Sequence, residues 1–114
     1  MSQQRIEAFE AMIAQQPEQE MVWYGLANEY IKIERWADAE AALRRVIALK
    51  TEFTAAYQLL GTALLKQGQT AEARGVWTEG IEVAGRTGAW KARQHMEGLL
   101  AGAEESAAGA AFCD

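Results

Sequence analysis

The sequence predicts an all-α fold in which antiparallel helix pairs stack into a solenoid, and three observations lead to this prediction. Alanine fills 23 of the 114 positions, and alanine loses little entropy on entering a helix. Pro17 is the only proline, so little in the chain would break a helix. A pattern of large and small apolar residues also recurs after 34 residues, as it does in stacked helical repeats.

Six helices are expected, and local signals place several of their ends. Pro17 ends the first helix because proline cannot continue one. Thr51, Thr70 and Thr87 are expected to be N-caps, since a threonine hydroxyl accepts a hydrogen bond from the first helical turn. Gly85 is expected to end the fifth helix. The expected ranges are 3–15, 19–33, 36–49, 52–66, 71–84 and 88–103.

The internal repeat has the spacing of a helix surface. Within each copy the recurring residues follow the 3.6-residue period of a helix, which places them on one helical face. Small residues let two backbones approach, and large side chains fill the space that remains. The matched positions are Trp23, Leu26, Ala27 and Tyr30 with Tyr57, Leu60, Gly61 and Leu64, and then Ala39, Leu43 and Val46 with Ala73, Trp77 and Gly80.

This pattern resembles the tetratricopeptide repeat (TPR), which reads W-x2-L-G-x2-Y, then A-x3-F, then P. The two copies above follow it, and a half-copy precedes them as Arg5-x3-Phe9 with Pro17 in the final proline position. The resemblance covers residues 5–100 and implies a right-handed TPR-like stack of about three helix pairs. The chain departs from the family pattern at four positions: Arg5, Thr51, Gly80 and Gly85.

The last helix departs from the repeat. The 34-residue register would place polar residues in its core, namely Lys91, Gln94, His95 and Gly98. Its apolar residues lie on another stripe, which predicts a solvated helix that caps the stack. A shift of one residue would instead bring three apolar residues into the core positions, and both arrangements stay open. The stripe is Ala89, Ala92, Met96, Leu99 or Leu100, and Ala103, and the shifted core residues are Ala92, Met96 and Leu99.

The chain is expected to divide into a repeat domain over 1–103 and a tail over 104–114. The tail is rich in alanine and glycine, carries acids and has no sustained apolar stripe, so we expect it to be disordered. Phe112 and Cys113 near its end are expected to have no role, with a docking hook or a redox-sensitive thiol as the alternatives.

Charge and motifs exclude several function classes. The net charge of −5 argues against nucleic acid as a partner, and no apolar run is long enough to span a membrane. The single cysteine and the absence of a signal segment favour a cytoplasmic protein. No catalytic or nucleotide-binding motif is present, and His95 is expected on the solvated face. We therefore expect no metal, no cofactor and no enzymatic activity.

The resemblance implies a non-catalytic protein–protein interaction module that binds a peptide or protein segment in a concave groove. In such stacks the first helix of each pair lines the groove. The groove residues predicted to meet a partner include three cations and no acid, which suggests an acidic or C-terminal segment. These residues are Tyr24, Asn28, Lys32, Gln58, Thr62, Lys66, Arg93 and Met96. Met96, like Leu59 and Leu65, could instead pack helix against helix.

Two further interpretations concern the partner. Some TPR co-chaperones bind a terminal carboxylate through a clamp of five residues. In repeat order these are a Lys and an Asn, then an Asn, and then a Lys and an Arg. By repeat position only Asn28 and Arg93 match that clamp, while Tyr24, Leu59 and Ala89 do not. We therefore expect no chaperone-tail binding of that type.

The alternative to a peptide-binding module is a homodimer formed through an uncapped helix or through the exposed edge at Trp90. A small enzyme is the least favoured alternative.

Overall fold

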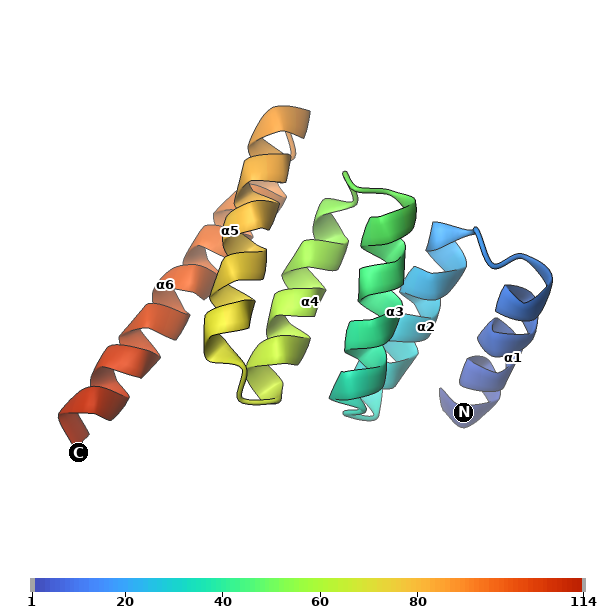
Figure 1. Cartoon of the computed structure of the whole chain (residues 1–114), viewed down its shortest axis with the longest axis horizontal. Helices are drawn as coiled ribbons and strands as arrows, with labels where there is room; N and C mark the ends of the chain where they lie inside the picture. The colour runs from blue at the N-terminus through green and yellow to red at the C-terminus, as the bar shows by residue number, and fades with distance from the viewer. Residues whose placement is uncertain (1, 114) are drawn as a thin grey trace.

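The chain folds into a row of antiparallel helices, which confirms the all-α helix-pair solenoid. The computed structural model describes the backbone of residues 2–113 and the side chains of residues 3–103. In Figure 1 the helices follow one another across the molecule in chain order, from α1 to α6. Across residues 2–113 the structure has six helices and no strand: α1 Ser2–Gln15, α2 Glu20–Lys32, α3 Trp36–Leu49, α4 Thr54–Lys66, α5 Thr70–Thr87 and α6 Trp90–Cys113.

Each helix packs mainly on its neighbours in the sequence, and α4 also contacts α6. The stack is correspondingly flat, with extents of 49 × 33 × 19 Å. Chain-neighbour packing of this kind is the defining feature of a repeat solenoid. It places α2, α4 and α6 as the first helices of successive pairs, with α3 and α5 as their second helices and α1 as the preceding half-copy.

The core is formed by large side chains that face small ones. Trp77 on α5 is fully buried, and a Cβ at Gly61 on α4 would overlap its indole ring. The indole N–H donates a hydrogen bond to the Gln58 backbone oxygen at 3.1 Å, so burying the ring leaves no polar group unpaired. The prediction that large side chains fill the space left by small residues is confirmed at this contact.

The helix ends differ from the sequence expectation. Helix α4 begins at Thr54 and not at 52, and its N-cap is Phe53, so Thr51 is not a cap. Thr70 is the first residue of α5 and not its cap. Helix α5 continues through Gly85 to Thr87, whose hydroxyl donates within the helix to the Val83 oxygen at 3.0 Å. It ends where Gly88 takes φ 78°, a conformation that glycine adopts without steric cost, whereas Gly85 is helical.

Helix α6 packs in the register that is shifted by one residue. Met96 and Ala103 are buried, and Ala92 and Leu99 pack against the core. Lys91, Gln94, His95 and Gly98 are exposed, so the unshifted register is wrong for this helix. The physical reason is solvation: the unshifted register would bury a lysine and two further polar side chains without partners.

The backbone of α6 continues as a helix to Cys113, whereas the sequence predicts a helix that ends at 103 and a disordered segment over 104–114. The division into a repeat domain and a tail therefore stays a prediction. The questions about Phe112 and Cys113 lie outside the described side chains.

Candidate functional site

The first helices of the two complete pairs carry matching polar groups. The Asn28 amide donates to the Tyr24 backbone oxygen at 3.0 Å, and the Thr62 hydroxyl donates to the Gln58 backbone oxygen at 3.2 Å. These two bonds are equivalent under the 34-residue repeat. Each side chain keeps hydrogen-bonding capacity, because the Asn28 carbonyl and its second N–H and the lone pairs of Thr62 are not used in these bonds. The repeat thus presents polar groups at one spacing on α2 and α4.

An aromatic contact borders these groups. The rings of Tyr24 on α2 and Phe53, which precedes α4, have centroids 4.8 Å apart and are tilted by 44°. Both rings are partly buried against the main core. Met21, one turn earlier on α2, leaves 60% of its surface exposed. This end of the surface therefore offers apolar area next to the polar row.

The three predicted cations differ in their surroundings. Lys32 is held by Glu29, with its Nζ 2.9 Å from the carboxylate, and Arg93 lies 3.5 Å from Glu97. Each of these cations already has an acidic partner, although neither Glu29 nor Glu97 belongs to the predicted groove set. Lys66 lies over the Trp36 ring, with its Nζ 6.0 Å from the ring centroid.

Among the side chains of residues 3–103, Lys66 makes no ion pair. An unpaired ammonium group keeps its full attraction for a partner's anion. Lys66 is therefore the strongest candidate of the three for binding an acidic group.

Met96 was predicted both as part of the apolar stripe and as a groove residue, and the structure shows only the first role. Its side chain is fully buried. A Cβ at Gly80 on α5 would lie 2.6 Å from the Met96 sulfur, so the sulfur fills the space that this glycine leaves. The one-residue shift of α6 causes the difference, and Met96 is removed from the candidate site.

Sequence reasoning missed a buried acid beside this surface. Glu29 is only 5% exposed, and one of its carboxylate oxygens has no hydrogen-bond partner. Its other oxygen contacts Lys32 and lies 3.9 Å from Arg5 on α1. The repeat register could have revealed this group, because it aligns Glu29 with Ala63 and Arg5 with Ala39.

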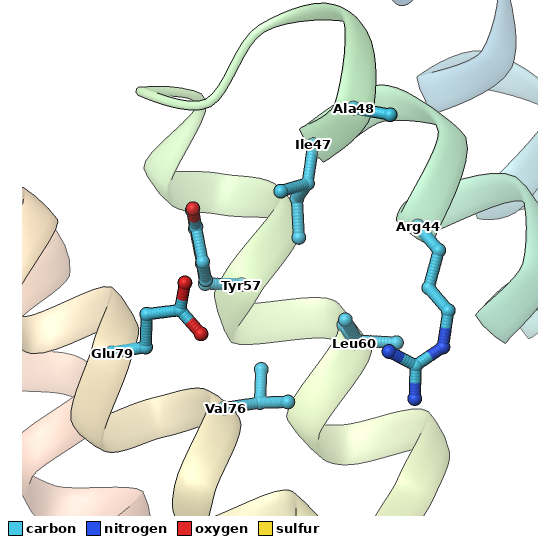
Figure 2. Close-up of a pocket in the computed structure, with 7 residues that line it drawn as sticks. All are labelled: Arg44, Ile47, Ala48, Tyr57, Leu60, Val76 and Glu79. Atoms are coloured by element: carbon cyan, nitrogen blue, oxygen red, sulfur yellow. The ribbon is translucent and has the colours of Figure 1, made fainter.

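A second surface feature lies on α3, α4 and α5, and the sequence did not predict it. It is an open hollow of about 250 Å³ with a mainly apolar lining and a charge on either side. Figure 2 shows Glu79 at one side, Arg44 at the other and Val76 and Leu60 between them. The lining residues are Arg44, Ile47, Ala48, Tyr57, Leu60, Val76 and Glu79.

Tyr57 forms one wall of the hollow. Burial raises the pKa of its hydroxyl, the negative charge of Glu79 raises that pKa further, and the positive charge of Arg86 opposes part of this increase. The hydroxyl donates to the Thr51 backbone oxygen at 2.8 Å. The Tyr57 hydroxyl is therefore neutral and held by its hydrogen bond, so Tyr57 shapes the hollow and is not a reactive group.

Two other kinds of site do not occur in the described part of the chain. No group of three or more possible metal ligands occurs there. No helix there is long and apolar enough to cross a membrane. His95 is exposed on α6, as the sequence predicted.

Comparison with known proteins supports one family. The chain is similar to the TPR repeat-containing protein PA0015 of Pseudomonas aeruginosa, with 31% identity over 98 residues that cover 83% of this chain and 90% of that protein. No protein-family model matches the chain.

Two solved structures have the same fold. The solution structure of protein BPP2914 from Bordetella parapertussis has a TM-score of 0.79 and 26% identity, covering 89% of this chain and 88% of that one. The first TPR of Spaghetti (RPAP3), bound to the HSP90 peptide SRMEEVD, has a TM-score of 0.78 and covers 90% of this chain and 77% of that one. Its identity of 18% shows a shared fold alone.

Proposed function

Because the chain belongs to the tetratricopeptide repeat family, we propose that it is a non-catalytic, cytoplasmic protein–protein interaction module. It binds a peptide or protein segment along the first helices α2, α4 and α6. A structural neighbour that binds a short peptide on the same fold supports this kind of partner. The segment is expected to be acidic or to end in its own carboxylate.

The unpaired cation at Lys66 carries the proposal. It lies on the central first helix, 34 residues from Lys32, so a segment running along the groove passes both ammonium groups. Lys32 and Arg93 would bind an acid only in competition with Glu29 and Glu97. Lys66 has no such competitor among residues 3–103, and its ammonium is therefore the main anchor for the acidic group.

The remaining groove residues supply orientation and apolar contact. Asn28, Gln58 and Thr62 hydrogen-bond to the backbone of an extended segment, because an extended backbone presents a donor or an acceptor at each residue. Tyr24, which is only partly buried, offers apolar area to a side chain of the segment. The charged anchor at Lys66 then fixes the register of the segment.

The test is capture of partners from extract of the source cell, with the double variant Lys66→Glu and Arg93→Glu compared with the unaltered chain. We expect the double variant to fold normally and to lose the partners that the unaltered chain retains, because two attractive charges become repulsive. A matched control is Arg45→Glu, which reverses an exposed cation on the second helix α3. Quantitative mass spectrometry of the retained proteins is the readout. Equal retention by all three chains would contradict the groove assignment.

A chaperone tail is not expected to be the partner. A synthetic peptide ending in MEEVD, titrated while tryptophan fluorescence is followed, should show no saturable binding at micromolar concentration. The reason is that only Asn28 and Arg93 occupy clamp positions, and Arg93 is paired with Glu97. Saturable micromolar binding would show that the clamp comparison is wrong.

A further inference from the structure

We propose that the hollow on α3, α4 and α5 receives the Trp90–Lys91 corner of a second copy of this chain. The hollow combines an apolar floor with an acid that lacks a partner. The corner combines an exposed indole with a cation that lacks a partner. The two features complement each other in apolar character and in charge, and they lie on different helices of the molecule.

Two charged residues line the hollow, Arg44 and Glu79, and only Arg44 makes ion pairs. Arg44 on one rim is already bound by Glu40 at 2.9 Å and by Glu72 at 3.5 Å. Glu79 lies on the opposite rim (Figure 2). It makes no ion pair or side-chain hydrogen bond with any residue in the range 3–103. Between the rims the floor is formed by Leu60 and Val76. An occupant therefore needs an apolar side chain with a cation next to it.

The start of α6 carries such a pair. Trp90 is 61% exposed, more than any other large apolar side chain in the described range. The Nζ of Lys91 lies 5.6 Å from its ring centroid, and Lys91 makes no ion pair with residues 3–103. The indole and the ammonium group therefore lie side by side at the surface. Burial of an indole in an apolar hollow is strongly favourable.

The other exposed apolar side chains do not meet the requirement. They are Met12, Met21 and Ile33. Met12 and Met21 have no neighbouring cation in the sequence, and the lysine before Ile33 is already bound by Glu29. Of the four exposed apolar side chains, only Trp90 therefore has an adjacent cation that makes no ion pair among residues 3–103.

The expected association is weak. One aromatic side chain buries about 150–250 Å², whereas stable protein complexes bury about 1,200–2,000 Å² in total. Because the hollow and the corner are different patches, copies join head to tail. The exception is a closed dimer, in which the corner of each copy occupies the hollow of the other. Either geometry gives an average mass that increases with concentration.

The test is analytical ultracentrifugation of the purified full chain between about 10 µM and 1 mM, the range where weak contacts are populated. We expect the average mass to increase with concentration for the unaltered chain and for the control Met12→Ala. Trp90→Ala and Glu79→Lys should each remain at the monomer mass, with circular dichroism confirming that both are folded. A constant monomer mass for the unaltered chain would overturn the proposal.

Two further variants separate this contact from other forms of self-association. The charge swap Glu79→Lys with Lys91→Glu should restore the concentration dependence that Glu79→Lys abolishes. A mixture of Trp90→Ala with Glu79→Lys should form heterodimers, because one variant keeps the hollow and the other keeps the corner. Failure of both restorations would overturn the pairing of Glu79 with Lys91. Loss of association in Trp90→Ala but not in Glu79→Lys would place the indole elsewhere and would also overturn it.

Discussion

The contact of α4 with α5 differs from the contact of α1 with α2. In the first, the Trp77 ring lies against the bare backbone of Gly61. In the second, the charged side chains of Arg5 and Glu29 meet, with a guanidinium nitrogen 3.9 Å from a carboxylate oxygen. Trp77 is fully buried and its one polar atom is hydrogen-bonded. Glu29 is nearly as well buried, but one of its oxygens has no partner. The same repeat therefore packs without charges in its centre and with a buried charge at its first junction.

The difference shows what the repeat pattern does and does not require. The alignment of Arg5 with Ala39 and of Glu29 with Ala63 means that two small residues in one junction correspond to a salt bridge in the other. Ala39 and Ala63 are both fully buried in one core cluster. A charged pair is tolerated at the first junction because Arg5 is largely exposed and can remain hydrated, while Lys32 supplies a second cation to Glu29.

The largest expected effect comes from breaking the central contact. Gly61→Trp should abolish folding or cost more than about 4 kcal/mol, because no large side chain fits where even a Cβ overlaps the Trp77 indole. Urea denaturation followed by circular dichroism measures the loss. The control is Gly75→Ala, at an exposed helical glycine with nothing within 4 Å of the added Cβ, which should gain about 0.5–1 kcal/mol. A stable, cooperatively folding Gly61→Trp chain would show that this contact does not hold the stack together.

An intermediate effect is expected when the charge of the first junction is copied into the second. Ala63→Glu should cost about 3 kcal/mol or more, because Ala63 is fully buried and its repeat-equivalent neighbour is Ala39 and not an arginine. The same denaturation experiment measures it, with Ala41→Glu on the exposed face of α3 as the matched control. If the two variants lost equal stability, the difference between the junctions would not lie in the missing cation.

The sequence predicted the parts of this comparison that depend on local spacing. The 34-residue register placed Gly61 and Trp77 correctly because large and small apolar residues recur at helical intervals. It left the register of α6 open, since the two arrangements differ by one residue and the burial of Met96 and Ala103 decides between them only in the folded structure. The three threonine caps were wrong: α4 and α5 begin after Phe53 and Gln69, which make no side-chain cap hydrogen bond, and Thr87 lies inside α5.

The candidate site was predictable in outline only. The polar and cationic positions on α2 and α4 followed from the repeat, whereas the partners that neutralise Lys32 and Arg93 depend on side-chain directions. The hollow was not predictable, because its lining comes from three helices and includes residues that lie 35 positions apart, from Arg44 to Glu79. Periodicity identifies the face of one helix, but it does not show where three helices leave space.

The smallest expected effect concerns the buried acid itself. Glu29→Ala should be nearly neutral, or stabilising by about 0.5–1 kcal/mol, because it removes a buried oxygen without a partner. The two cations that it releases, Arg5 and Lys32, leave 66% and 54% of their side chains exposed and are readily hydrated. Urea denaturation at neutral pH measures the effect, and Arg5→Ala is the companion variant that leaves Glu29 with Lys32 as its only cation. We expect Arg5→Ala to be the less stable of the two. If Glu29→Ala instead lost several kcal/mol, the salt bridge would be a main support of the first junction, and both contacts would then be essential to the stack.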